Sequence, residues 1–112
     1  MDALYAAASS QQEAIDESYE LEIDAAGKCT LRAATDAGAL HGMESFTQLL
    51  QRPTEGGGGV TLDFLPVTIT DAARFPHRGL LIDSSRHFLP VSEILLVIDS
   101  LPMSKFNVLH CK

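Results

Sequence analysis

The feature that most constrains the fold is a short apolar run that ends in polar residues and is followed by a helical pattern. Gly79–Asp83 is apolar up to its last residue and shows no alternation, which is typical of a parallel strand buried on both faces. A loop (Ser84–Leu89), a helical stripe (Pro90–Lys105) and a second apolar run (Phe106–His110) follow. This order predicts a β-α-β unit with a right-handed crossover. The helix is expected to bury Val91, Ile94, Leu95, Ile98 and Leu101.

The loop beyond the first of these strands is the candidate binding site. Ligand sites of parallel α/β folds lie beyond the carboxyl ends of the strands. Arg86 lies in this loop and His110 ends the second strand, so both are expected to face one pocket that Asp83 also lines. A guanidinium there can donate two hydrogen bonds to vicinal hydroxyls or to a carboxylate. The structural alternatives are that Arg86 pairs with Asp83 and that His87 caps or packs.

Metal and disulfide chemistry are not expected. His110 stands beside Cys111, but two candidate ligands without a third do not make a metal site. Cys29 and Cys111 are too few to form a disulfide framework, so both are expected to be reduced or buried thiols.

The first half of the chain has a different pattern. Tyr19–Ile23 and Cys29–Thr35 alternate between apolar and polar residues, and Ala25–Lys28 supplies a turn, which predicts a β-hairpin with a four-residue loop. Val60–Thr70 is rich in strand formers, with Pro66 at an edge or a bulge. Residues 71–77 are the expected connector between this α+β unit and the β-α-β unit.

A helix is predicted between the hairpin and that later strand. Its apolar residues recur at three- and four-residue spacing, and they are Leu40, Met43, Phe46, Leu49 and Leu50. Asp36 is placed to cap its N-terminus. Gly38 and Gly42 each weaken a helix by up to ~1 kcal/mol, or they let it lie close against a sheet. Pro53 and Gly56–Gly59 end the helix in a loop, and no following lysine and helix support a phosphate site.

Charge argues against nucleic-acid binding, since the net charge is -7. Arg74, Arg78 and Arg86 nevertheless form a locally basic segment, which suits an anionic or hydroxyl-rich ligand. Ion pairing with distant acids is the alternative for Arg74 and Arg78. No membrane span and no signal peptide are expected from the hydrophobic pattern.

Long segments of the chain resemble glycoside hydrolase family 20, the β-N-acetylhexosaminidases. RFPHRGLLIDSSRHFLPV and IDSLPMSKFNVLH resemble the start of that family's catalytic barrel. DESYELEI, the L-x-A-x-T of residues 31–35 and GALHGMESFTQLL resemble the α+β domain that precedes it. The resemblance implies a leader (residues 1–15), a partial α+β domain (16–73) and the first β-α-β of an incomplete (β/α)8 barrel (74–112).

The resemblance also implies a function. The family removes terminal N-acetylglucosamine or N-acetylgalactosamine from glycans with retention, and the substrate's acetamide is the nucleophile. Arg86 matches the arginine that holds hydroxyls of the terminal sugar. No cofactor is implied, the substrate is an N-acetylhexosamine-terminated glycan, and a homodimer is expected. The implied location is the lysosome, the vacuole or the exterior.

Departures from the family pattern bear on activity. The family usually continues N-V-L-H into Trp-His, whereas this chain has Cys111 and Lys112. No Asp-Glu pair follows at the end of a later strand, so no catalytic residue is assigned, and a truncated chain without activity is expected. Ala73 stands where the family tends to have proline, and Pro102 within a helix costs about 3 kcal/mol.

Two other functions remain open. Exposed barrel strands make the chain a candidate non-catalytic interaction module that binds a full-length relative. An independent α/β domain would bind an anion through Arg86 and the helix N-terminus near Pro90, although such a domain needs more than two parallel strands.

Overall fold

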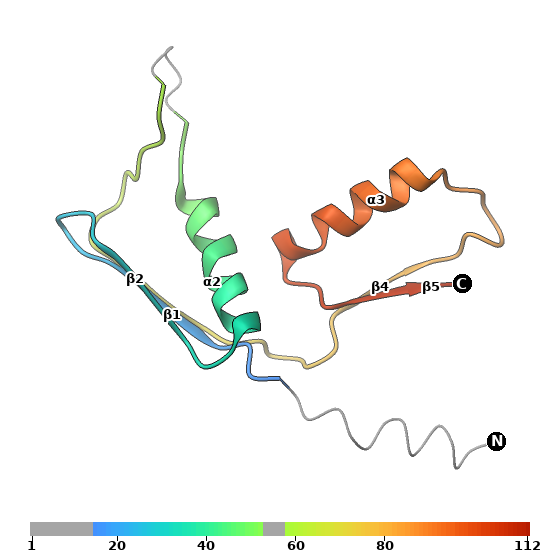
Figure 1. Cartoon of the computed structure of the whole chain (residues 1–112), viewed down its shortest axis with the longest axis horizontal. Helices are drawn as coiled ribbons and strands as arrows, with labels where there is room; N and C mark the ends of the chain where they lie inside the picture. Colours follow the sequence, from blue (N-terminus) through green and yellow to red (C-terminus); the bar gives the residue numbers. More distant parts are fainter. Residues whose placement is uncertain (1–14, 53–57) are drawn as a thin grey trace.

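The computed structural model describes residues 15–52 and 58–112 (Figure 1). Residues 1–14 of the expected leader and residues 53–57 of the expected glycine loop lie outside this description. The elements, in chain order, are β1 (Tyr19–Ile23), β2 (Cys29–Ala33), α2 (Asp36–Leu49), β3 (Val67–Asp71), β4 (Gly79–Ile82), α3 (Val91–Ser100), the 3-10 helix η1 (Pro102–Ser104) and β5 (Val108–Cys111).

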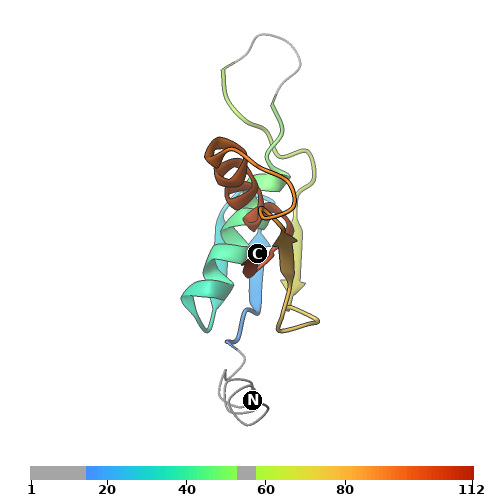
Figure 2. The ribbon, with the colours of Figure 1, turned by 90° about the vertical axis from the view of Figure 1, so that its right-hand side faces the viewer.

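These elements form two units, and each is a sheet with one helix. The first unit is an antiparallel sheet of order β2-β1-β3 packed against α2, and the second is the parallel pair β4-β5 with α3. Figure 2 shows both helices on the same side of their sheets. The predicted α+β unit and the β-α-β unit are therefore both present as local structures. Within the described part of the chain no helix is long and apolar enough to cross a membrane.

The hairpin is confirmed, with a loop one residue longer than expected. Ile23 pairs with Cys29, so residues 24–28 form the loop. The carboxylate of Asp24 accepts hydrogen bonds from the backbone N–H groups of Ala26 and Lys28, both at 2.9 Å. Gly27 has a φ of 83°, a conformation that glycine adopts at little cost. The Asp24 carboxylate and Gly27 together form the turn.

The hydrophobic core lies on one face of the central strand β1. Tyr19, Leu21 and Ile23 are buried there, while Glu20 and Glu22 point to the other face. β3 completes the sheet, but it covers only the last part of the predicted strand segment and includes Asp71 from the expected connector. Of the segment's first residues, Thr61 forms an isolated bridge with Gln51.

The N-cap of α2 is Thr35, so the prediction of Asp36 is wrong by one position. Thr35 is extended (φ -134°), and its hydroxyl accepts a hydrogen bond from Gly38 N at 3.2 Å. Asp36 is already helical and occupies the first turn, where its negative charge favours the helix dipole. A hydroxyl directly before the first helical residue satisfies a free N–H group, which is the usual function of an N-cap.

Only part of the predicted apolar stripe of α2 is covered, since Phe46, Leu49 and Leu50 are half-buried. Leu40 is 63% exposed and Met43 is 53% exposed, whereas Gly38, Gly42 and Ser45 are buried against the sheet. The helix backbone lies so close to the sheet that an added Cβ would meet the Ser18 carbonyl oxygen at Gly38 and the Leu31 side chain at Gly42. The alternative role of the glycines, close approach to a sheet, is therefore confirmed.

The helix of the second unit is shorter than predicted. Pro90 is its N-cap rather than its first residue, and the helix ends at Ser100. Pro102 then begins η1, and Lys105 leaves it in a left-handed conformation (φ 54°). Since Pro102 starts a separate turn, it does not interrupt the interior of a helix, and the expected cost of about 3 kcal/mol does not apply.

The burial predicted for the second unit is wrong within this chain. Ile82 is the only buried residue of β4, and α3 buries none of its residues. The exposed apolar side chains of the unit include Leu80, Leu81, Val91, Leu95, Leu96 and Ile98. The physical reason is that each strand has one neighbour and one helix covers a single face, so the other face and both edges are open.

We expect Gly38→Ala to destabilise the chain by roughly 1–3 kcal/mol, the usual cost of overpacking. An added Cβ would meet the carbonyl oxygen of Ser18 and would lie 3.2 Å from the Ala33 Cβ. Ser18 contributes backbone, which cannot rotate away, so this cost exceeds the ~1 kcal/mol that alanine gains in helix propensity.

Urea unfolding followed by circular dichroism measures this effect. Leu40→Ala changes an exposed position of the same helix and is the control, with an expected change within about 0.5 kcal/mol. Equal stability of the Gly38→Ala variant and the unmodified chain would contradict the close packing of α2.

Candidate functional site

The carboxyl ends of β4 and β5 meet in one place, as the parallel topology predicts. Lys112 N donates to Ile82 O at 2.9 Å, and Ser84 N donates to Lys112 O at 2.9 Å. The Ser84 hydroxyl also donates to Lys112 O at 3.1 Å. The loop after β4 is therefore fixed to the end of β5 by backbone and hydroxyl hydrogen bonds.

Asp83 organises this loop. Its Oδ1 accepts hydrogen bonds from the backbone N–H groups of Ser85 and Arg86, both at 3.1 Å. Its Oδ2 lies 3.3 Å from Arg86 Nε. An aspartate that accepts from the following backbone groups stabilises a turn. Asp83 thus holds both the backbone and the side chain of Arg86.

Arg86 forms the structural pair that was one of its two predicted roles. Its side chain is nevertheless 78% exposed, and such exposed ion pairs contribute about 0–1 kcal/mol. The contact with Asp83 uses Nε, and within the described residues no hydrogen bond or ion pair involves the terminal nitrogens Nη1 and Nη2. A ligand carrying hydroxyls or a carboxylate can therefore compete for this guanidinium at low cost.

The two histidines of the prediction have different outcomes. His110 lies on β5 level with Leu81 of β4, so it is close to the end of the sheet where the Arg86 loop begins. No hydrogen bond or ion pair joins Arg86 and His110 in the described ranges, and their sharing one pocket stays a prediction. His87 is exposed, and α3 has no side-chain cap, so the prediction that His87 caps or packs is wrong.

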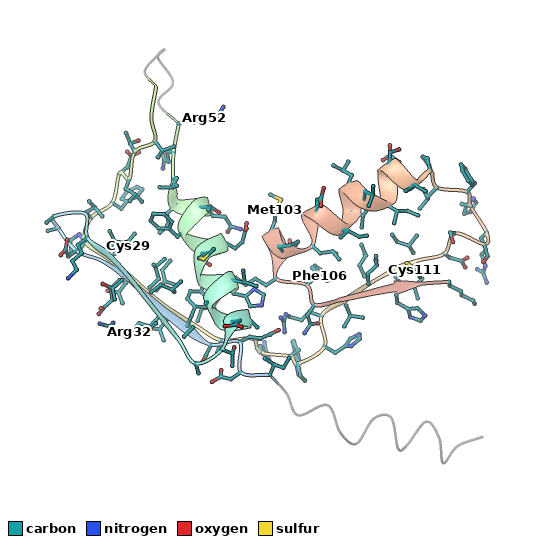
Figure 3. All side chains as sticks on the ribbon, viewed as in Figure 1. Cys29, Arg32, Arg52, Met103, Phe106 and Cys111 are labelled. Atoms are coloured by element: carbon teal, nitrogen blue, oxygen red, sulfur yellow. The ribbon has the colours of Figure 1, made fainter. Side chains whose placement is uncertain are left out.

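No group of three or more His, Cys, Asp or Glu residues within residues 15–52 and 58–112 is arranged to hold a metal ion. Cys29 and Cys111 are exposed free thiols that lie in different units (Figure 3). Their exposure shows that they are not the buried thiols that the sequence allowed.

A second cluster of charged groups lies where the two units meet. Arg78, just before β4, has Nη2 2.6 Å from Glu17 Oε2, and the two side chains are 17% and 10% exposed. This contact is an ion pair whose geometry falls outside that of a directed hydrogen bond. His41 Nε2 lies 3.7 Å from Glu17 Oε1. The alternative that Arg78 pairs with a distant acid is confirmed, whereas Arg74 lies over the ring of Phe75.

A neighbouring network joins the same two units. Lys105 Nζ donates to Asp71 Oδ2 at 2.5 Å and to the Tyr19 hydroxyl at 2.8 Å. The Tyr19 hydroxyl also contacts Asp71 Oδ2 at 3.1 Å and Ser45 Oγ at 2.5 Å. The hydrogen bond from Lys105 lowers the pKa of Asp71. Burial acts to lower the pKa of Lys105, but its bonds to Asp71 and Tyr19 outweigh burial and raise it.

These two networks border a small, partly open cavity of about 190 Å³. Its lining includes Glu17, Tyr19, His41, Asp71, Arg78 and Lys105. Sequence reasoning named Arg78 but missed this cluster, because its members come from five separate segments. The sequence did carry one signal for this pairing, which is an excess of acidic residues before β1 and of basic residues after β3.

Comparison with known proteins identifies the family. Residues 75–112 match the family described as glycosyl hydrolase family 20, catalytic domain, and residues 4–49 match the family described as beta-acetyl hexosaminidase like. The chain belongs to glycoside hydrolase family 20. The Asp83–Arg86 loop and the β4-β5 pair lie within the match to the catalytic domain.

Individual relatives agree with this assignment. Beta-hexosaminidase subunit alpha of Rattus norvegicus is 46% identical over 94 residues, which are 84% of this chain and 17% of the relative. The Flavobacterium johnsoniae chitobiase structure is 43% identical with a TM-score of 0.71, over 86% of this chain and 14% of that one. A family 20 exo beta-N-acetylglucosaminidase from Vibrio harveyi has 28% identity and a TM-score of 0.72, over 85% and 14%. The chain thus spans about one sixth of the rat relative.

We expect stability to fall with acid, partly through Asp71. Its pKa is lowered in the folded state, so the stabilisation is complete above the unfolded value of about 3.9 and is lost as pH falls through the folded value. Asp71→Asn should therefore be less stable than the unmodified chain at pH 7 and should lose less stability below about pH 4.

The urea midpoint measured across this pH range tests the expectation. Asp99→Asn removes a carboxylate from the exposed surface of α3 and controls for the change in net charge. Parallel pH profiles for Asp71→Asn and the unmodified chain would show that the Lys105–Asp71 contact carries no pH-dependent stability.

Proposed function

We propose that these residues are the N-terminal α+β domain and the first β-α-β of the (β/α)8 barrel of a β-N-acetylhexosaminidase. The whole protein would remove terminal N-acetylglucosamine or N-acetylgalactosamine from glycans with retention, using the substrate's acetamide as nucleophile. The observation that carries this proposal is the Asp83–Arg86 loop at the carboxyl end of the parallel strands, because barrel enzymes bind substrate at that end.

Arg86 is the proposed sugar-binding residue. Its planar guanidinium can donate to two neighbouring hydroxyls at once, and Asp83 orients it through Nε. Asp83 and His110 are proposed to line the same pocket. This assignment supports binding of the terminal sugar and leaves the proton transfer to other groups.

The 112-residue chain alone is proposed to be inactive. The mechanism needs an adjacent Asp-Glu pair at the end of a barrel strand, whereas the only such pair here is Asp16–Glu17, which precedes β1. Asp16 accepts a hydrogen bond from Ser18 N at 2.9 Å, and Glu17 is paired with Arg78. Both carboxylates therefore have structural roles far from the Arg86 loop.

Titration with N-acetylglucosamine, followed by amide NMR, tests the role of Arg86. We expect chemical-shift changes confined to amides of the loop after β4. The dissociation constant should lie in the millimolar range, because a single exposed subsite supplies few contacts. Arg86→Ala should lose these shifts, whereas Arg74→Ala, whose guanidinium lies over Phe75, should retain them.

Two outcomes would contradict the proposal. Identical titrations of the Arg86→Ala variant and the unmodified chain would remove the assigned role of Arg86. Release of chromophore from a chromogenic N-acetylglucosaminide by the pure chain would contradict its inactivity.

Location and assembly follow from the same proposal. We place the whole enzyme in the lysosome, the vacuole or the exterior, and we propose that it forms a homodimer.

A second candidate function is a non-catalytic interaction module. The observation that favours it is the apolar surface of the β-α-β unit, where Phe88, Val91 and Leu96 are all more than half exposed. Contiguous exposed apolar surface is typical of protein contacts. The partner would be a full-length member of the same family, whose barrel strands match the open edges of β4 and β5.

Co-purification with a full-length family 20 relative tests this second function. We expect a complex of defined stoichiometry by light scattering, and Leu96→Glu should weaken it by at least tenfold because a charge would enter an apolar contact. Glu93→Gln on the same helix is the control. Only insoluble chain, or separate elution of the two proteins, would count against an interaction role.

A further inference from the structure

The loop after β4 places one accessible cation beside one fixed anion. The Arg86 side chain is 78% exposed, whereas the Asp83 side chain is only 21% exposed. Asp83 Oδ2 lies 3.3 Å from Arg86 Nε, and the terminal nitrogens of Arg86 carry the N–H donors that face away from this contact. A ligand that reaches these terminal nitrogens therefore binds next to a carboxylate.

The Asp83 carboxylate is held in place independently of the Arg86 side chain. Its Oδ1 accepts hydrogen bonds from the backbone N–H groups of Ser85 and Arg86, both at 3.1 Å. The loop is itself fixed, because Ser84 N and Ser84 Oγ both donate to Lys112 O, at 2.9 Å and 3.1 Å. A ligand that binds Arg86 can replace the contact at Nε, but the negative charge of Asp83 stays beside the site.

A fixed negative charge affects anionic and uncharged ligands differently. An anion at the terminal nitrogens of Arg86 would lie within the Debye length of Asp83, which is ~10 Å at 0.1 M salt, so repulsion offsets part of its attraction to the guanidinium. A hydroxyl oxygen carries no net charge and accepts the same hydrogen bonds with little opposition. The basic segment of the sequence suits both anionic and hydroxyl-rich ligands, and the position of Asp83 favours the hydroxyl-rich ones.

We propose that Asp83 is a specificity-determining residue that keeps the Arg86 site selective for uncharged sugars over anionic ones. This proposal rests on the proposed function of Arg86 in binding sugar hydroxyls, and it adds the class of ligand that the loop rejects. Asp83 acts here through its charge, in addition to the turn that its Oδ1 stabilises. The two roles are separable, because an uncharged acceptor in its place keeps the turn and loses the charge.

Titration of the whole chain with two sugars, followed by amide NMR, tests the role of this charge. N-acetylglucosamine is the uncharged probe, and glucuronate is the probe that carries a carboxylate. Asp83→Asn keeps a side-chain oxygen that can accept from Ser85 N and Arg86 N. In this variant the affinity for glucuronate relative to N-acetylglucosamine should rise about twofold to fivefold at low salt, the usual range for an exposed charge pair. The rise should shrink as salt is added, which a purely structural effect would not do.

Three controls isolate the charge of Asp83. Asp83→Ser supplies a hydroxyl acceptor for the same turn and should give the same change, so the result does not depend on the folding of one variant. Asp99→Asn removes an exposed carboxylate from α3 and should leave the affinity ratio unchanged. At pH 8 histidine side chains are largely neutral, and Lys112 is common to all variants, so neither contributes to the difference.

The outcomes separate this proposal from the proposed function. If N-acetylglucosamine still binds through Arg86 but the affinity ratio is unchanged in Asp83→Asn and Asp83→Ser, the selectivity role is overturned and the sugar-binding role stands. An equal rise in Asp99→Asn, or loss of N-acetylglucosamine binding in both Asp83 variants, would also overturn the selectivity role. Failure of the unmodified chain to bind N-acetylglucosamine would overturn both proposals.

Discussion

The contact between Glu17 and Arg78 is the interaction on which the arrangement of the two units depends. Both side chains are largely buried, and a buried guanidinium without a counter-charge would cost several kcal/mol. The charge pair therefore fixes which end of the strand pair meets the α+β unit. The apolar surfaces of the two units do not supply this specificity, because α3 buries none of its residues.

The charge contacts between the units and the proposed sugar-binding loop lie at opposite ends of the same strands. Glu17, Arg78 and Lys105 act at the amino ends of β4 and β5, whereas Asp83 and Arg86 follow the carboxyl end of β4. This division agrees with barrel enzymes generally, in which the carboxyl end carries the site and the amino end carries stability. The loop can remain exposed because the contacts that hold β4 and β5 are made at the amino ends of the strands.

Local patterns in the sequence predicted the elements and the loop well. Alternation gave β1 and β2, and the unbroken apolar run gave β4. The Arg86–Asp83 pair was predictable because the residues are close in sequence. The Glu17–Arg78 pair was not, since nothing local to Arg78 indicates which distant acid it meets. The predicted N-cap of α2 was wrong by one residue. Threonine and aspartate both precede the helical stripe, and both side chains can accept hydrogen bonds from its free N–H groups.

The errors in burial have a common physical origin. The spacing of apolar residues along a helix or strand indicates which side chains share a face, but it does not indicate what covers that face. In α2 the sheet meets Gly38, Gly42 and Ser45, so Leu40 and Met43 face outward. In β4 and α3 the apolar face has the predicted composition, but one strand and one helix are too few to cover it. Under the proposed barrel, neighbouring strands and helices would cover these side chains, so the same pattern that fails for the 112 residues alone is consistent with a larger α/β fold.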